Sequence, residues 1–162
     1  MNAIMRHATL IGLALLLSSC GFALRGTQQA PVAIDTVVLR GDVSSALTRQ
    51  LRQALESVGV TTVIAQSANY VLTVGPERLN TRTLSVNGRA QAAQYELQMA
   101  VEATLERGDA LLLPPEIISV ERSYFEDTAN IAGSNAEREL LQNEMRQELV
   151  DRLVRRLAAA AG

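Results

Sequence analysis

The stretch Tyr-Glu-Leu-Gln-Met-Ala-Val-Glu-Ala-Thr-Leu-Glu, residues 95–106, decides the fold. Its odd positions are all apolar, whereas most even positions carry Glu, Gln or Thr. Strict alternation over this length predicts a β-strand with one buried face and one solvated face. Because sheets solvated on one side are usually antiparallel, we expect antiparallel neighbours and an outer face that bears Glu96, Gln98 and Glu102.

Signals on both sides of this strand predict its neighbours. Gly108-Asp109 indicates a turn, and a second strand is expected over residues 116–125. On the other side, Asn87-Gly88 predicts a two-residue hairpin, because both residue types accept a positive φ. A further strand is expected from Asn69. Beyond Pro76 its alternation loses phase, as a bulge or an edge position would cause.

Two amphipathic helices are predicted outside this group of strands. The first follows a short β-branched strand, residues 35–40, and is expected to be capped by Asp42. The second runs almost to the C-terminus, and Ser134 with Glu137 matches a capping box at its start. Apolar residues recur at helical spacing in the two segments, namely Leu47, Leu51, Leu55 and Val58, then Leu141, Met145, Leu149, Leu153 and Leu157.

The order of these elements, β-α-β-β-β-α, predicts an α+β fold. We expect a two-layer sandwich, in which a four-stranded mixed sheet carries both helices on one face. The first strand, the first helix and the second strand form a crossover, so those two strands should be parallel. Residues 35–162 are expected to form a single domain, preceded by a tether over residues 20–34.

The N-terminal segment predicts export and attachment of a lipid. Arg6 precedes an apolar run of about ten residues, too short to span a membrane, that ends in Leu-Ser-Ser-Cys at residues 17–20. This pattern describes a secretory signal peptide, residues 1–19, and resembles the lipobox of bacterial lipoproteins. Acylation of Cys20, the only cysteine, would explain an unpaired thiol in an exported protein. The alternative is an ordinary signal peptide with a free thiol.

Charge and composition limit the possible partners. All 15 basic residues are arginines, and Arg6 leaves with the signal peptide. In the mature chain, the 17 acidic residues therefore outnumber the remaining arginines. A mildly acidic domain gives no reason to expect nucleic-acid binding. The only histidine, His7, also lies in the signal peptide.

A mature chain without histidine, lysine or a free thiol lacks most catalytic groups. Ser-His-Asp, Cys-His and Ser-Lys nucleophiles, Schiff bases and His- or Cys-ligated zinc are excluded. Carboxylate chemistry remains, and no motif indicates an acid pair or a hard-cation site. We therefore predict a protein that is not an enzyme and needs no cofactor or metal. A carboxylate-based hydrolase acting on cell-wall glycans is the catalytic alternative.

The predicted hairpin is the first candidate binding surface. Arg78, Arg82 and Arg89 flank it, and guanidinium groups present paired donors to phosphate oxygens. The three arginines therefore form a candidate anion site. A solvated basic edge that discourages strand pairing is the alternative.

The end of the strand over residues 116–125 is the second candidate, as a partner interface. Arg122 is followed by Tyr124 and Phe125, two adjacent aromatics that point to opposite faces of a strand. An exposed aromatic near an arginine is typical of interface hot spots. The alternative is that both rings pack beneath the following loop.

Several segments together resemble the LPS-assembly lipoprotein family, LptE. The order and spacing of these segments carry the resemblance, which covers nearly the whole chain from Cys20. They are residues 20–26 (CGFALRG), 95–97 (YEL), 122–125 (RSYF) and the final helix over residues 137–157.

The resemblance implies an outer-membrane lipoprotein of Gram-negative bacteria, anchored through acylated Cys20 and facing the periplasm. Members of the family sit as a plug inside the β-barrel translocon LptD, assist its assembly and help place lipopolysaccharide in the outer leaflet. The family fold, two helices on a four-stranded sheet, agrees with the fold expected above. The alternative is an unrelated periplasm-facing lipoprotein, either a scaffold or a ligand-binding module.

The resemblance also implies where lipopolysaccharide would be held. In the family, basic residues on the central hairpin and in the loop before the last helix are thought to meet its phosphates. Here the hairpin offers Arg82 and Arg89, but the loop has no basic residue until Arg138. The sequence therefore departs from the family pattern at this site.

Overall fold

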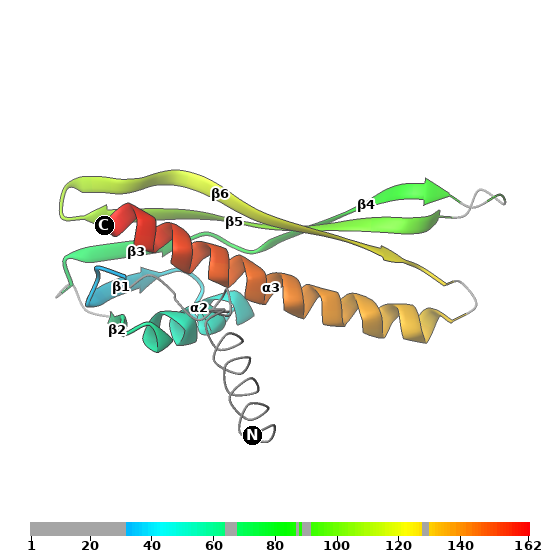
Figure 1. The fold of residues 1–162 in the computed structure, drawn as a ribbon, viewed down its shortest axis with the longest axis horizontal. Helices are drawn as coiled ribbons and strands as arrows, with labels where there is room; N and C mark the ends of the chain where they lie inside the picture. The colour runs from blue at the N-terminus through cyan, green and yellow to red at the C-terminus, as the bar shows by residue number, and fades with distance from the viewer. Residues whose placement is uncertain (1–31, 64–67, 87, 89–91, 128–129) are drawn as a thin grey trace, which may run out of the picture.

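The computed structural model describes residues 32–63, 68–86, 88, 92–127 and 130–162 (Figure 1). The signal peptide, Cys20, Asn87 and Arg89 lie outside the described residues. The elements in chain order are β1 (Thr36–Arg40), α2 (Ala46–Ser57), β2 (Thr61–Val63), β3 (Tyr70–Val74), β4 (Arg78–Val86), β5 (Ala92–Arg107), β6 (Ala110–Phe125) and α3 (Ile131–Ala161).

The long strand β5 organises the sheet, as its alternation predicts. It pairs antiparallel with β6 along one edge, and with β3 and then β4 along the other. On the far side of β3 lies β1, which is parallel to both β3 and β2. The predicted antiparallel neighbours of β5 and the parallel pairing across the crossover are both confirmed.

The two-layer α+β class is confirmed, but the predicted count of four strands is wrong. The described sheet has six strands. One extra strand, β2, is only three residues long, too short to show an alternation. The other arises because the predicted strand from Asn69 is divided at Gly75 and Pro76 into β3 and β4. Both pieces then pair with successive parts of β5.

Both predicted helix caps are displaced. Ser45, not Asp42, caps α2, since its Oγ accepts a hydrogen bond from the Thr48 N–H at 3.0 Å. Asn130, not Ser134, caps α3, through a 3.1 Å hydrogen bond that Oδ1 accepts from the Gly133 N–H. Ser134 is instead buried inside the helix. A side chain that can cap does so only where the chain enters the helix, and tertiary packing sets that point.

Two strand limits also differ from expectation. Register pairs Val86 with Ala92, so five residues rather than two separate β4 from β5. On the other side of β5, β6 begins at Ala110 rather than at residue 116, and passes through Pro114 and Pro115. Proline is compatible with this position because β6 is an edge strand.

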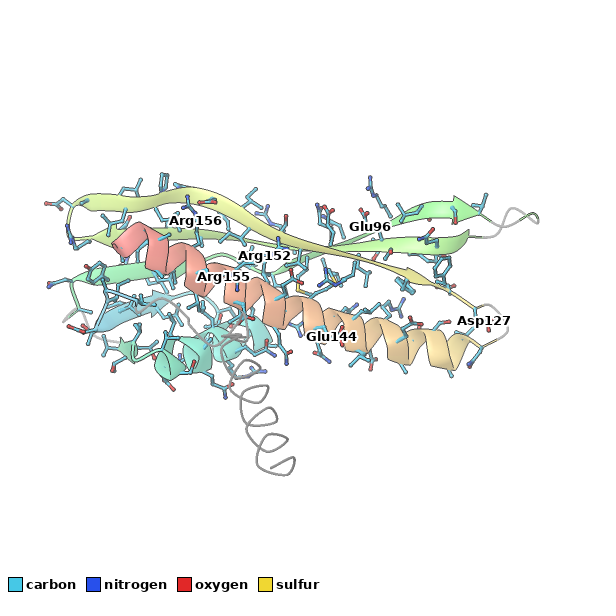
Figure 2. The ribbon with its side chains drawn as sticks, viewed as in Figure 1. Glu96, Asp127, Glu144, Arg152, Arg155 and Arg156 are labelled. Atoms are coloured by element: carbon cyan, nitrogen blue, oxygen red, sulfur yellow. The ribbon has the colours of Figure 1, made fainter. Side chains whose placement is uncertain are left out.

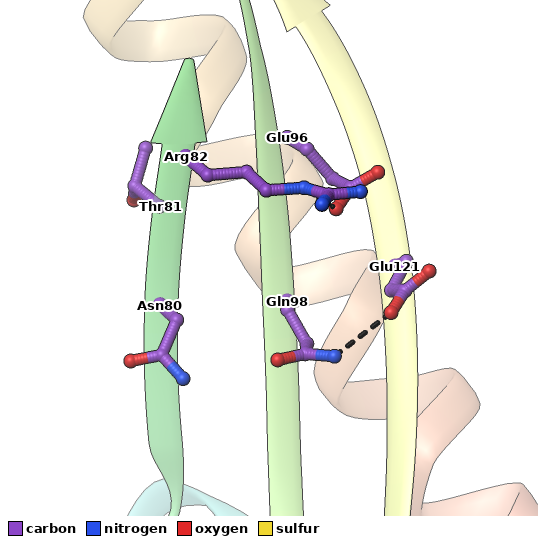
Figure 3. A pocket seen from close by; sticks show the side chains of 6 residues that line it. All are labelled: Asn80, Thr81, Arg82, Glu96, Gln98 and Glu121. Atoms are coloured by element: carbon purple, nitrogen blue, oxygen red, sulfur yellow. Dashed lines mark hydrogen bonds and ion pairs between the residues drawn. The ribbon is translucent and has the colours of Figure 1, made fainter. Parts of the chain in front are cut away.

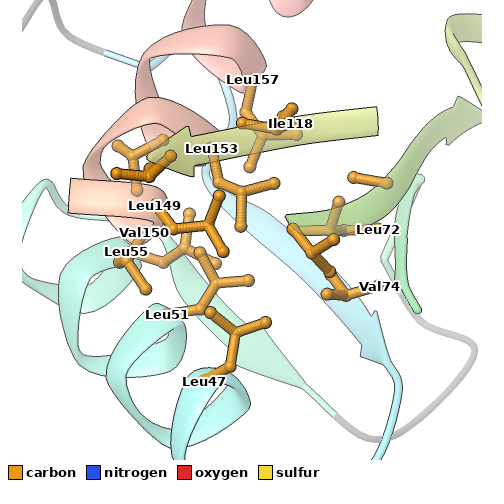
Figure 4. Packing of buried hydrophobic residues seen from close by; sticks show 14 of the residues in the cluster. Leu47, Leu51, Leu55, Leu72, Val74, Ile118, Leu149, Val150, Leu153 and Leu157 are labelled. Atoms are coloured by element: carbon orange, nitrogen blue, oxygen red, sulfur yellow. The ribbon is translucent and has the colours of Figure 1, made fainter. Parts of the chain in front are cut away.

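Both helices pack on one face of the sheet and share a single core (Figure 4). Leucines at helical spacing on α2 and α3 meet the apolar side chains of β3 and β5. Their combined burial is what stabilises the two layers, since each buried leucine contributes about 1.5–3 kcal/mol. The fully buried set includes Leu51, Leu72, Leu97, Met99, Leu149 and Leu153.

The sheet has two halves that differ in how much of their surface the helices cover. In the proximal half, β1, β2, β3 and the adjoining ends of β5 and β6 lie against α2 and the C-terminal part of α3 (Figure 1). In the distal half, β4 and the other ends of β5 and β6 extend away, with only the N-terminal part of α3 beside them. All nine residues of β4 are exposed.

Candidate functional site

The outer face of the distal sheet is a polar surface built from three strands (Figure 3). The predicted outward direction of the even β5 positions places Glu96 and Gln98 on it. Two pairs cross between strands: Arg82 Nε lies 2.6 Å from Glu96 Oε1, and Gln98 Nε2 donates to Glu121 Oε1 at 2.8 Å. The hollow between these pairs is lined by Asn80, Thr81, Arg82, Glu96, Gln98 and Glu121.

The structure separates the predicted hairpin arginines. Arg82 is ion-paired, and its hydrogen bond to Glu96 raises the arginine's pKa. Arg78 lies on the same face of β4 as Arg82, four residues and therefore about 13 Å from it, at 3.3 Å per residue. It is exposed, and it has no hydrogen-bonding or ion-pair partner among the described residues. With Arg89 outside the described residues, Arg78 is the described hairpin arginine with a free guanidinium.

The predicted interface residues at the end of β6 divide between two faces. Tyr124 is only 4% exposed and its ring stacks on Tyr95, with centroids 5.5 Å apart. Phe125 is 67% exposed and pairs with Gln94 on the outer face. Arg122 lies opposite Leu97, on the helix side, where it is ion-paired with Glu148 of α3. Adjacent strand residues alternate, so these side chains do not form one surface.

A carboxylate on α3 holds two arginines against the edge of β6. Glu148 is ion-paired with Arg122 and, at 2.7 Å, with Arg152. Hydrogen bonding to Arg152 and the charge of both arginines lower the pKa of Glu148. Each arginine also donates to a β6 carbonyl: Arg152 to Ser119 at 2.7 Å and Arg122 to Glu121 at 2.9 Å. We call Glu148, Arg122 and Arg152 the arginine clamp.

The sequence contains part of the signal for this clamp. Glu148 and Arg152 are four residues apart on one helix, which predicts their ion pair. The clamp's contact with β6 needs the packing of α3 against the strand, which helical spacing alone does not give. Figure 2 shows Arg152, Arg155 and Arg156 along the C-terminal part of α3.

A second ion pair joins the two halves of the sheet to α3. Glu77, between β3 and β4, accepts two hydrogen bonds from Arg146, at 2.7 and 2.8 Å. Their side chains are only 20% and 15% exposed. Hydrogen bonding to Glu77 raises the pKa of Arg146. The pair thus attaches α3 to the short connection between β3 and β4, the two strands that pair with successive parts of β5.

The described residues contain neither a membrane-spanning helix nor a metal-binding cluster. None of their helices combines the length and apolarity that a membrane span needs. Within the same residues, no group of three or more His, Cys, Asp or Glu side chains is placed to hold a metal ion.

The molecule is a two-layer α+β domain with an open polar sheet face, a fold that serves many functions in different proteins. Residues 29–157 match the family described as LptE, lipopolysaccharide-assembly. The match covers the described sheet, α2 and most of α3. The chain belongs to this family, as the resemblance in its sequence predicts.

Relatives in enterobacteria cover nearly the whole chain. The LPS-assembly lipoprotein LptE of Photorhabdus laumondii subsp. laumondii is 35% identical over 159 residues, which are 94% of this chain and 87% of that protein. The protein of the same name from Yersinia enterocolitica is 32% identical over 166 residues, 94% of this chain and 77% of that protein. The chain is accordingly a membrane-anchored lipoprotein of the cell envelope.

Solved structures share the fold. Rare lipoprotein B from Shewanella oneidensis superposes with a TM-score of 0.69 at 31% identity, covering 76% of this chain and 94% of that one. Lipoprotein B from Nitrosomonas europaea gives a TM-score of 0.72 at 21% identity, covering 86% and 91%. The second similarity concerns the fold alone.

Proposed function

We propose that this protein is a non-catalytic plug and assembly factor for LptD, the β-barrel that places lipopolysaccharide in the outer leaflet. The observation that carries the proposal is the family match over residues 29–157, which includes the entire described sheet, α2 and all but the last turn of α3. The mechanism is steric and adhesive. A rigid two-layer body fills the lumen, and its exposed distal half supplies contact surface.

The charged groups of the outer face favour binding over catalysis. In the hollow, Glu96 is bonded to Arg82 and Glu121 is bonded to Gln98. A glycosidase-like mechanism needs one free carboxylic acid and one free carboxylate on either side of a substrate. Two carboxylates already engaged by neighbours on an open sheet face do not fit that requirement.

We also propose that the mature chain begins at acylated Cys20 and that a tether connects the outer membrane to the domain. The tether is shorter than the predicted residues 20–34, because Ile34 is already part of the core, at 3% exposed. Three acyl chains would exceed the two signals that stable anchoring requires. Mass spectrometry of the N-terminal peptide would detect the added lipid. A Cys20→Ala variant should be recovered without lipid, and recovery of an unmodified free thiol in the native protein would contradict the proposal.

Purification from outer membranes tests the plug. A C-terminally tagged protein is extracted in mild detergent, and the co-purifying proteins are identified by mass spectrometry. We expect one large β-barrel protein in a 1:1 ratio. Recovery of the lipoprotein alone would favour the second candidate, a periplasm-facing scaffold or ligand-binding module.

Lipopolysaccharide contact is a separate step of the proposal. Arg78 is the main candidate because its guanidinium has no partner among the described residues, whereas Arg82 would have to leave Glu96 to reach a phosphate. Arg89 is the third candidate. Arg78→Glu should therefore weaken binding to purified lipopolysaccharide more than Arg82→Glu does. Arg155→Glu, an exposed change on α3, is the matched control, and equal binding by all three variants would overturn this step.

A further inference from the structure

The two long edge strands of the sheet, β4 and β6, differ in whether their outward backbone groups are hydrogen-bonded. In an antiparallel ladder, alternate residues direct both N–H and C=O toward the same neighbour. The Gly75 N–H donates to the Glu102 carbonyl at 2.8 Å, so even residues of β5 face the side of β3 and β4. The even residues of β4 pair with them, and Arg78, for instance, is opposite Ala100.

It follows that odd residues of β4 direct their backbone groups away from the sheet. Leu79, Thr81 and Thr83 present three N–H and three C=O groups along the free edge. None of these three residues makes a side-chain hydrogen bond within the described structure, and all of β4 is exposed. An unpaired row of this kind is a template for another strand.

The edge of β6, by contrast, is partly covered by side chains. Its outward carbonyls at Ser119 and Glu121 already accept hydrogen bonds from Arg152 and Arg122, the arginine clamp. Side chains therefore occupy two of the positions that an added strand would need on β6, whereas no described residue bonds to the corresponding positions on β4.

The register of β4 on β5 also limits the length of the open edge of β4. The register of β4 on β5 is regular from Arg78 to Thr83 and shifts between Thr83 and Ser85 and again before Val86. Bulges interrupt strand addition, so they limit a new ladder to about six residues. Six residues match the usual length of a strand in a sheet.

We propose that the edge of β4 from Arg78 to Thr83 accepts an extended segment of the barrel partner as an added strand. This inference rests on the plug function proposed above. The segment's side chains on the outer face would meet Arg78, Asn80 and Arg82, and those on the other face would meet Leu79, Thr81 and Thr83. The segment carries polar residues on the outer face, where Arg78 stays available to a phosphate, and apolar or β-branched residues on the other face.

Backbone amide exchange in the purified complex tests the added strand directly. The full mature protein is compared free and bound to its barrel, at single-residue resolution. We expect the amides of Leu79, Thr81 and Thr83 to exchange at least about tenfold more slowly in the complex, as new hydrogen bonds form. The amide of Ser123, on the clamped edge, is the internal reference and should change less.

Proline substitution tests the same hydrogen bonds by a different route. Thr81→Pro removes an outward N–H without removing a bond to β5, whereas Thr81→Val keeps the N–H and the branched shape. We expect Thr81→Pro to lower recovery of the barrel about tenfold, and Thr81→Val to leave it unchanged. Ser123→Pro, the matched change on β6, should also leave recovery unchanged. Thermal unfolding of each free variant shows whether it folds.

The outcomes separate the two proposals. If the barrel co-purifies but the three β4 amides exchange at the free rate, the added strand is overturned and the plug stands. If no barrel co-purifies with the wild-type protein, both fail. Concentration-dependent protection of the same amides in the free protein would place a second copy on β4 and also overturn the inference.

Discussion

The proximal and distal halves of the molecule share one long strand, yet they bury very different amounts of side chain. In the proximal half, leucines from α2 and α3 are 0–1% exposed, for example Leu51 and Leu153. In the distal half, Leu97 and Met99 of β5 are buried, but the whole of β4 is exposed, and Leu140 on the first half of α3 is 59% exposed. Hydrophobic stabilisation scales with buried apolar area. Stability is therefore concentrated in the proximal half, and the distal half offers surface for partners.

A matched pair of leucine substitutions on one helix tests this division most strongly. Leu153→Ala removes a fully buried side chain from the proximal core and should lower the free energy of unfolding by about 3 kcal/mol. Leu140→Ala removes an exposed side chain from the same helix and should change it by less than about 0.5 kcal/mol. Urea unfolding of the mature protein measures both. Similar losses would mean that the distal half contributes to the core as much as the proximal half does.

The ion pair between the halves should have the next largest effect. Arg146 and Glu77 are largely shielded from water, so removing either leaves the other poorly compensated. A double-mutant cycle with Arg146→Met and Glu77→Gln should give a coupling of about 1–2 kcal/mol. Loss of the pair should also speed amide exchange in β4 and leave β1 unchanged.

The control for that cycle is the exposed pair in the distal half. Arg82 and Glu96 have similar geometry, but the arginine side chain is 70% exposed. Solvent screening should make the coupling of Arg82→Met with Glu96→Gln clearly smaller. Equal couplings in the two cycles would show that the junction between the halves is no better shielded than the outer face.

The proximal half was also the more predictable from sequence. The leucine spacing of both helices and the alternation of β5 gave the layers, the buried faces and the antiparallel pairing. These patterns are strong because burial on one face imposes a period on the sequence. The short strand β2 was missed, since three residues cannot display a period.

The distal surfaces depend on long-range packing that the sequence does not encode locally. The pattern indicated that Tyr124 and Phe125 face opposite sides, but only the packing of α3 makes Tyr124 the buried one. In the same way, arginines could be located near the hairpin, whereas the pairing of Arg82 with Glu96 follows from the register of β4 on β5. Ion pairs between strands need register, and register was the least predictable feature.

The smallest expected effect concerns pH and the clamped edge of β6. The pKa of Glu148 is lowered in the folded protein by its hydrogen bond to Arg152 and by both arginine charges. A lowered folded pKa stabilises the protein above the unfolded value, about 4.3 for glutamate, and this contribution is lost as pH falls through the folded pKa. Acidification below about pH 4.3 should therefore lower stability by a small amount, because Arg122 and Arg152 are each 44% exposed and solvent screens their charges.

Glu148→Gln should remove that part of the pH dependence, whereas Glu144→Gln, an exposed change on the same helix, should retain it. Urea unfolding between pH 7 and pH 3 compares the two variants with the wild type. Protonated Glu148 no longer holds Arg122 and Arg152 by charge, so the amide of Val120, which pairs with Met99 of β5, should exchange faster relative to those of β4 at low pH. The two edges would then become more alike. An unchanged ratio of exchange rates would mean that the arginines close the β6 edge without help from Glu148.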